Sequence, residues 1–225
     1  MEFQVSFELN NKLFLRNPEK TDLGKQIVKN AVELIHSIGF ENFTFKKLAI
    51  EIKTTEASIY RYFENKHRLL LYILNWYWSY IQFLVDYKLQ NISNPKLKLI
   101  SILEILTNNL PESNDKLELN KDALNQIVIS ESSKCYLVKD ITDINKENIF
   151  KPYKDLCAKI AEIISEYDSG YIYPRSLSST IIESSHQQSF FSKNLPRLTD
   201  FKKNELNYTY HFLENLIFSI LKKTY

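Results

Sequence analysis

Apolar residues along this chain recur mostly at intervals of three and four positions, which is the period of an amphipathic helix. A short stripe of this kind consists of Phe45, Leu48, Ala49 and Ile52. Thr44 stands just before it and is a favoured residue for the helix N-cap. Polar residues at 53–55 interrupt the pattern, and a second short helix is expected over 56–63, with Ile59 and Phe63 on its buried side. Two short helices joined by a tight turn predict a helix-turn-helix, a motif whose second helix lies in the DNA major groove.

Longer helices are expected on either side of this pair. The first begins after Thr21 or Asp22 and ends at Gly39, because glycine readily takes the left-handed conformation that closes a helix. A long helix over 66–90 is rich in aromatic residues and has Asn65 as its N-cap. Further helices are expected at 95–109, 117–133, 148–167, 174–193 and 202–223, with turn-like stretches between them, one of them at 140–145. The pattern therefore predicts an all-α chain.

Residues 1–22 follow a different pattern, in which apolar residues alternate with polar ones. Alternation of this kind predicts a small β-hairpin, with a disordered tail as the alternative. The segment is slightly acidic and rich in Phe, so we expect it to pack on the protein instead of entering a DNA groove. We divide the chain into this N-terminal arm, a helix-turn-helix domain over 23–68, and a helical regulatory and dimerisation domain over 69–225. The long helix joins the last two without a break.

Charge is distributed in a way that fits the helix-turn-helix. The net charge of the 225-residue chain is only +2, which by itself does not indicate a nucleic-acid partner. Residues 20–68 nevertheless carry nine Lys and Arg against six Asp and Glu, whereas residues 69–225 carry eighteen of each. A basic excess on the module that faces DNA is the expected electrostatic footprint. The alternative is an ordinary pair of surface helices.

Residues 39–70 carry a more specific signal. Gly39 is followed by Thr44-Phe-Lys-Lys-Leu48-Ala49 and then by Ala57-Ser58-Ile59-Tyr60-Arg61-Tyr62-Phe63-Glu-Asn-Lys66-His-Arg-Leu69-Leu70. This run resembles the N-terminal domain of the TetR family of bacterial transcriptional regulators. Two positions depart from that family's pattern, since Lys53 stands where a turn Gly is usual and Thr54 replaces a small apolar residue. A left-handed backbone would be strained for a lysine.

The resemblance implies a DNA-binding transcriptional regulator, which we expect to be a dimeric repressor of operator DNA. It implies that Thr44, Tyr60 and Lys66 contact phosphates and that Ser58 and Arg61 lie nearest the base edges. The full set of expected DNA contacts is Thr44, Lys46, Thr55, Ala57, Ser58, Tyr60, Arg61, Tyr62 and Lys66. The resemblance also implies that the long helix joins the DNA-binding domain to the body and that its tilt transmits the state of a ligand.

The last two long helices carry more apolar surface than a single core requires. We expect them to form a two-fold homodimer interface, with a fully buried helix in a monomer as the alternative. The expected interface residues are Ile181, Ile182, Ser185, Phe190, Tyr208, Phe212, Leu216, Phe218 and Ile220. A dimer also suits the DNA, because a two-fold protein matches two half-sites on one duplex.

The aromatic residues of the long helix indicate a ligand cavity in the body. We expect a largely apolar cavity lined by Trp76 and Tyr80, with Cys135 and Cys157 among its polar groups. Such a cavity takes an uncharged or amphipathic organic ligand in preference to a metal or a phosphate. The alternative is that these aromatics fill the core. In that case a partner protein, or nothing, controls the same fold as a DNA-binding or interaction module.

Catalysis and membrane insertion find no support in the sequence. It has no Gly-rich phosphate loop, no nucleophile elbow and no His-x-x-x-His spacing, so we expect neither an enzyme nor a cofactor or metal site. It has no 18-residue apolar run and no secretory signal, which predicts a cytoplasmic protein without a membrane span. Cys135 and Cys157 lack His or Cys partners at ligand spacing and are expected to be reduced structural residues.

Overall fold

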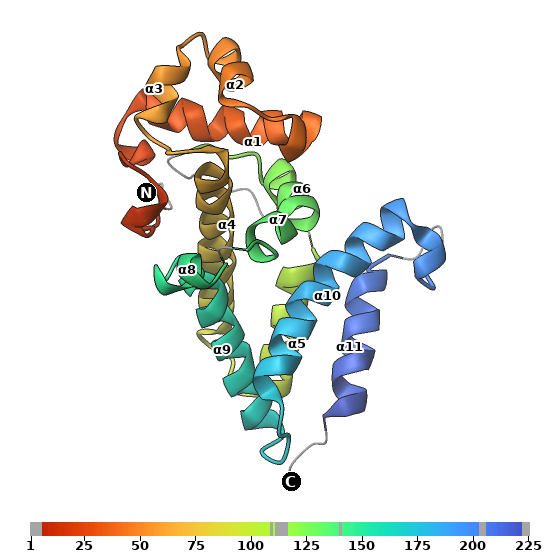
Figure 1. Cartoon of the computed structure of the whole chain (residues 1–225). Coiled ribbons are helices and arrows are strands. Elements are labelled where there is room, and N and C mark those ends of the chain that lie inside the picture. The colour runs from red at the N-terminus through yellow and green to blue at the C-terminus, as the bar shows by residue number, and fades with distance from the viewer. Residues whose placement is uncertain (1–5, 109, 111–116, 140, 203–205, 222–225) are drawn as a thin grey trace. The chain divides into compact units, whose positions relative to one another are not determined.

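The computed structural model describes residues 6–108, 110, 117–139, 141–202 and 206–221. Every regular element within these ranges is a helix (Figure 1). In chain order the elements are η1 (Asn11–Leu13), η2 (Pro18–Lys20), α1 (Asp22–Asn42), α2 (Phe45–Glu51), α3 (Glu56–Tyr60), α4 (Lys66–Leu89), α5 (Pro95–Thr107), α6 (Lys121–Glu131), α7 (Ser133–Tyr136), α8 (Ile141–Lys146), α9 (Lys151–Tyr167), α10 (Pro174–Asn194), η3 (Pro196–Leu198) and α11 (Tyr208–Ile220). The prediction of an all-α chain is confirmed.

The chain packs as two compact units. Unit 1 consists of residues 1–79 and 110–151, and unit 2 consists of residues 80–109 and 152–225. Helix α4 contributes its first turns to unit 1 and its last turns to unit 2. These units are defined by packing, whereas the predicted boundary at residue 68 divides the chain by role. That division by role stays a prediction.

Helices α1, α2 and α3 of unit 1 form a small three-helix head (Figure 1). Its core contains Val28 from α1, Leu48 from α2 and Ile59 from α3, all fully buried. Thr21 caps α1 as predicted, because its side chain accepts a hydrogen bond from the backbone N–H of Gly24 at 3.1 Å. Helix α1 also packs against η2 and α6, which attaches the head to the rest of unit 1.

The regular course of α1 breaks at Gly39, where φ is +76°. A residue with a Cβ is disfavoured at this φ, so the glycine sets the position of the break. Phe40 follows it and is buried in unit 1. Just after the break, the carbonyl of Phe40 accepts from the backbone N–H of Phe43 at 3.3 Å, a tightened last turn that is common at a helix C-terminus.

The described part of the N-terminal arm, residues 6–22, forms two 3₁₀ turns, so the predicted β-hairpin is wrong there. The side chains of Asn10 and Asn17 cause the difference. Each accepts a hydrogen bond at 2.9 Å from the backbone N–H two residues later, at Lys12 and Glu19. Asparagine closes turns in this way and competes with strand pairing.

The arm nevertheless packs on unit 1, as expected from its Phe content. The ring of Phe7 meets the ring of Trp76 edge to face, with centroids 5.4 Å apart. Leu13 is fully buried. The backbone N–H of Leu15 donates to the carbonyl of Tyr62 at 2.7 Å. The arm therefore ties the end of α3 to the middle of α4.

Unit 2 is formed by the end of α4 together with α5, α9, α10 and α11. Helices α10 and α11 pack on each other and on α5. Their core includes Leu103, Ile160, Ile181 and Leu213. The predicted starts of α5 and α10 are confirmed, and Pro152 lies in the first turn of α9, where its missing N–H is not needed.

Several elements differ from the sequence prediction. Helix α3 ends at Tyr60 instead of residue 63, and α9 begins at Lys151 instead of residue 148. Helix α6 begins only at Lys121, because Asn120 accepts a hydrogen bond from the backbone N–H of Ala123 at 3.0 Å and caps the helix there. The stretch 140–145 was predicted to be turn-like, but its residues 141–145 belong to the short helix α8 (Ile141–Lys146). Helix α11 begins at Tyr208 instead of residue 202. Positions 203–205 and 222–225 of the predicted last helix lie outside the described residues.

Candidate nucleic-acid interface

The two short helices of the head each begin with a threonine cap. The hydroxyl of Thr44 accepts from the backbone N–H of Lys47 at 3.2 Å and starts α2. The hydroxyl of Thr55 accepts from the backbone N–H of Ser58 at 3.2 Å and lies 3.0 Å from the Ser58 hydroxyl. These caps fix where α3 begins, and so they fix which of its side chains face outward.

The turn between α2 and α3 is built around Lys53. Its φ is +53°, so the lysine takes the left-handed conformation that was expected to be strained. The backbone N–H of Thr54 then donates to the carbonyl of Ala49 at 2.8 Å and closes the turn. The side chain of Lys53 is exposed. The turn therefore adds a cation beside α3 that was absent from the predicted contact set, although its departure from the family pattern marked the position.

The outward side of the head brings most of the predicted contact residues together. Tyr60 is 49% exposed, and the edge of its ring packs against Phe45 with centroids 4.9 Å apart. Lys46 and Arg61 are exposed as well. We call the following set the recognition surface: Thr44, Lys46, Lys53, Thr55, Ala57, Ser58, Tyr60 and Arg61. It offers cations and hydroxyls, the groups that bind phosphates and base edges.

Two predicted contacts face inward instead. Tyr62 is only 2% exposed, and its hydroxyl lies 2.7 Å from the hydroxyl of Thr21. The ammonium of Lys66 donates to the carbonyls of Phe40, Glu41 and Phe43 at 3.0, 3.3 and 3.2 Å. Both side chains thus hold the head together. We remove them from the proposed DNA contacts, because sequence spacing alone does not show the direction in which a side chain points.

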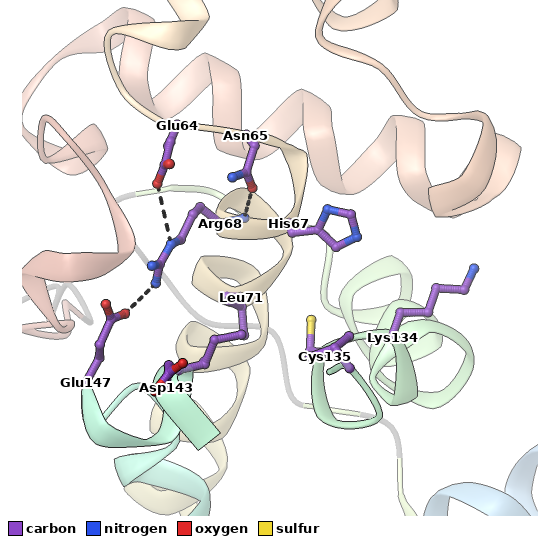
Figure 2. Close-up of a pocket in the computed structure, with 11 residues that line it drawn as sticks. Glu64, Asn65, His67, Arg68, Leu71, Lys134, Cys135, Asp143 and Glu147 are labelled. Carbon is purple, nitrogen blue, oxygen red and sulfur yellow. Dashed lines mark hydrogen bonds and ion pairs between the residues drawn. The ribbon is translucent and has the colours of Figure 1, made fainter. Parts of the chain in front are cut away.

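A cavity of about 530 Å³ lies in unit 1 at the beginning of α4 (Figure 2). Its wall is formed by residues of α4, α7 and α8 and their connections: Glu64, Asn65, His67, Arg68, Leu71, Lys134, Cys135, Val138, Asp143, Ile144 and Glu147. Figure 2 shows the side chains of Arg68 and Glu147 pointing toward one another. This wall is more polar than the apolar cavity that the sequence predicts.

Of the four predicted ligand contacts, Cys135 lines this cavity and the other three do not. Trp76 is buried between Phe7 and Lys121, whose ammonium lies 5.0 Å from the indole ring. Tyr80 is buried as well, and Cys157 is half-buried in α9. Burial raises the pKa of Cys135 to about 12 and that of Cys157 to about 11. Both thiols are free and protonated at neutral pH, as expected for structural cysteines.

The predicted dimer residues fall into two groups. Ile181, Ile182 and Ser185 are buried within a single chain, so they cannot supply contact surface to a partner. On α11, the side chains of Tyr208, Phe212, Leu216 and Ile220 recur every fourth position and stay partly or largely exposed. We call these four residues the α11 stripe. Phe190 is half-buried, and Phe218 packs on Tyr167 of the same unit at 5.5 Å.

Metal clusters and membrane-spanning helices are both absent from the described residues. These residues contain no group of three His, Cys, Asp or Glu that could hold a metal ion. No helix among them is both long and apolar enough to cross a membrane. The head, with its capped pair of short helices and its exposed cations and hydroxyls, is that of a helix-turn-helix DNA-binding protein.

The family follows from comparison with known proteins. Residues 27–73 match the model of the bacterial regulatory proteins of the tetR family. Residues 27–73 therefore form a helix-turn-helix domain of the TetR family of transcriptional regulators. The match covers α2, α3 and parts of α1 and α4, about a fifth of the chain. The sequence of this chain has no significant match among curated proteins.

Solved structures share the whole fold at low sequence identity. AibR in complex with isovaleryl coenzyme A and operator DNA has a TM-score of 0.59 at 16% identity, over 92% of this chain and 100% of that one. The fatty acid degradation regulator FadR from Bacillus halodurans has a TM-score of 0.61 at 16% identity, over 88% and 98%. The superantigen PfiT has a TM-score of 0.59 at 12% identity, over 93% and 100%. The chain therefore shares the TetR-like fold with these structures over most of its length.

Proposed function

We propose that this regulator is a homodimeric repressor that a small organic ligand releases from its operator. The observation that carries the DNA-binding part is the recognition surface, on which Lys46 of α2 and Tyr60 and Arg61 at the end of α3 are exposed. A tyrosine hydroxyl and a lysine ammonium suit phosphate contacts, and an arginine fork suits the edge of a guanine.

The α11 stripe supports the homodimer. Phe212 is 37% exposed and Ile220 is 40% exposed, while a neighbouring face of the helix buries Leu213 and Ile217. Apolar residues on two faces of one helix favour a second packing partner. A second copy of the same chain fits, because a two-fold dimer presents two recognition surfaces to two half-sites about 34–36 Å apart or a multiple of that.

The cavity at the beginning of α4 supports control by a ligand. Its volume lies within the range of about 300–1,000 Å³ that is usual for small-molecule sites. Arg68 and Leu71 of its wall belong to the first two turns of the helix that follows the helix-turn-helix directly. AibR has the same fold and is solved with both isovaleryl coenzyme A and operator DNA, so the fold is compatible with both partners.

DNA binding is tested with duplex from the region upstream of the protein's own coding sequence. We expect the double variant Lys46→Ala/Arg61→Ala to bind this DNA much more weakly than wild type at the same salt concentration. The matched control is Lys193→Ala/Arg197→Ala, since both of these residues are exposed in unit 2. Equal affinity of wild type and Lys46→Ala/Arg61→Ala would reject the recognition surface.

Repression is tested separately with a reporter gene placed behind the bound DNA. We expect expression of the regulator to lower the reporter signal and Lys46→Ala/Arg61→Ala to restore it. A second candidate function is that of an interaction module with the same fold and no ligand. The superantigen PfiT, which shares this fold, supports it. DNA affinity that no small molecule changes, together with stable capture of a protein partner, would favour this second function.

A further inference from the structure

We propose that the cavity at the beginning of α4 binds a small organic carboxylate with an apolar tail, and that Arg68 holds the carboxylate in competition with Glu147. Binding of the carboxylate is independent of the proposed function. Its effect on DNA rests on the proposed function, in which a ligand releases the operator.

Arg68 has hydrogen-bonding capacity to spare. Its Nη1 donates to the carboxylate of Glu147 at 2.7 Å, and its Nε lies 3.8 Å from the carboxylate of Glu64, beyond a normal hydrogen bond. A guanidinium carries five N–H donors in a planar fork. Among the described residues these are its two carboxylate partners, so several donors remain for a second, bidentate carboxylate.

The positions of the charges favour an anion over a cation. The side chain of Arg68 is 22% exposed, whereas those of Glu64 and Asp143 are 65% and 79% exposed. A charge that is less exposed interacts more strongly, because water screens it less. Asp143 is also paired with Lys146 at 2.8 Å. Glu64 and Asp143 thus offer a cation only weak, solvated contacts, and the less exposed Glu147 is already paired with Arg68.

The other cation of the wall is already satisfied. The ammonium of Lys134 lies 2.7 Å from Glu131 and 3.0 Å from Glu41. The partial burial of His67 and the neighbouring Lys66 lower the pKa of that imidazole, so His67 is largely neutral at pH 7. Arg68 is therefore the charged donor of this wall with the most capacity left for a ligand. A single guanidinium among three carboxylates suits a monoanion better than a phosphate dianion.

The rest of the wall suits an apolar tail. Leu71, Cys135, Val138 and Ile144 contribute apolar side chains from three helices and a connection. Burial keeps the Cys135 thiol protonated, so it does not add a charge that would repel an anion. A ligand with a short aliphatic chain and a carboxylate matches both parts of the wall, because the chain packs on these apolar residues and the carboxylate binds Arg68.

The site lies where three segments of unit 1 meet. Arg68 belongs to the first turn of α4, and the backbone carbonyl of Glu147 accepts a hydrogen bond from the side chain of Asn10 at 2.7 Å. A ligand that draws Arg68 from Glu147 therefore loosens the contact between α4, the α8–α9 connection and the N-terminal arm. The arm in turn binds the end of α3 through Tyr62.

The test measures binding of hexanoate, hexanol and hexylamine to the full-length protein by calorimetry at pH 7. These probes share the tail and differ in the head group. We expect hexanoate to bind wild type more tightly than the other two, and Arg68→Gln to weaken hexanoate by roughly tenfold or more, which is the usual effect of losing a charge-assisted hydrogen bond. Glu147→Gln should instead tighten hexanoate, because it removes the competing carboxylate.

Two controls keep the result interpretable. Arg197→Gln removes an exposed arginine of η3 and should leave hexanoate binding unchanged. Thermal unfolding shows whether each variant is folded, and Arg68→Lys, which keeps the charge and loses the fork, should bind hexanoate with intermediate affinity. Equal binding of hexanoate and hexanol, tighter binding of hexylamine, no binding of any probe at millimolar concentration, or weaker hexanoate binding by Glu147→Gln would each overturn the proposal.

A final measurement separates this inference from the proposed function. The DNA affinity of wild type is measured with and without saturating hexanoate. If hexanoate binds through Arg68 and DNA affinity is unchanged, the carboxylate site stands and the ligand-released repressor is rejected for this class of ligand. If another ligand releases DNA while Arg68→Gln and wild type bind hexanoate equally, the repressor stands and the carboxylate site is rejected.

Discussion

The ammonium of Lys66 lies 3.0 Å from the backbone carbonyl oxygen of Phe40, and this contact joins the first residue of α4 to the end of α1. Two further carbonyls, of Glu41 and Phe43, accept from the same ammonium. All three follow the break at Gly39, at the C-terminus of α1, where carbonyls have hydrogen-bonding capacity that the helix does not use. A residue that resembles a phosphate contact in the sequence is therefore a structural cap in the folded protein.

We expect Lys66→Ala to lower the free energy of unfolding by about 1.5–3 kcal/mol, the usual effect of losing hydrogen bonds to a charged group. Urea denaturation measures this change. The matched variant Lys46→Ala removes an exposed lysine of α2 and should leave stability unchanged, while it reduces the salt dependence of DNA binding by about one unit of slope. If Lys66→Ala has unchanged stability and a smaller salt dependence of DNA binding, Lys66 contacts DNA phosphates after all.

We expect Arg61 to recognise a DNA base and not only to bind the phosphate backbone of the DNA. It is exposed at the end of α3, and a bidentate contact with one base is worth about 1–3 kcal/mol of discrimination. Arg61→Ala should therefore narrow the difference in affinity between operator DNA and unrelated DNA. Competition binding with both duplexes at a single salt concentration measures it. An equal loss on both duplexes would assign Arg61 to a phosphate.

Local signals in the sequence were sufficient to predict most helices of the fold. The predicted caps at Thr21 and Thr44 form their hydrogen bonds, because a cap depends on only a few neighbouring residues. The same locality explains the errors. Apolar alternation in the N-terminal arm does not show that Asn10 and Asn17 close turns, and the polar composition of 141–146 conceals a short exposed helix.

The α11 stripe should hold the homodimer together. We expect Leu216→Asp to give a monomer at micromolar concentration, because it places a charge in the middle of the apolar contact. The neighbouring variant Asn215→Asp changes an exposed polar residue and should leave the dimer intact. Light scattering on both variants and wild type measures the mass in solution. A wild-type monomer, or a Leu216→Asp dimer of unchanged affinity, would contradict the proposed interface.

Stability should fall in mildly acidic solution because of His186 in α10. Burial lowers its pKa to about 4, whereas an unfolded histidine titrates near 6.5. Between these values the unfolded state binds the proton and the folded state does not, so the free energy of unfolding decreases as pH falls from about 6.5 to 4. The full loss is roughly 3 kcal/mol.

The pH dependence of His186 is measured by urea denaturation between pH 7 and pH 4.5. The variant His186→Gln should show a weaker decrease in stability over this range than wild type. His211→Gln, which changes an exposed histidine of α11, should follow wild type. Parallel curves for wild type and His186→Gln would show that other groups cause the acid sensitivity.

The candidate sites were predictable only in part. They depend on the direction in which each side chain points and on contacts between residues that are far apart in the sequence. Tyr60 and Tyr62 are two residues apart in the same motif, yet the first is 49% exposed and the second 2%. The cavity depends on Arg68 meeting Glu147, which is 79 positions away in the sequence. Helical periodicity contains no information about such a pair. Trp76 was expected to line the ligand cavity, but the N-terminal arm covers it.

The left-handed turn residue Lys53 bears on how this protein can evolve. A glycine at φ +53° would relieve a strain of about 1–2 kcal/mol, so selection for stability alone would replace the lysine. We expect Lys53→Gly to raise the unfolding temperature and to weaken DNA binding with a smaller salt dependence, because a cation beside α3 is lost. The lysine at this position then lowers the stability of the protein and raises its affinity for DNA. Regulators that lack the cation would have to recover the same affinity from other contacts with their operators.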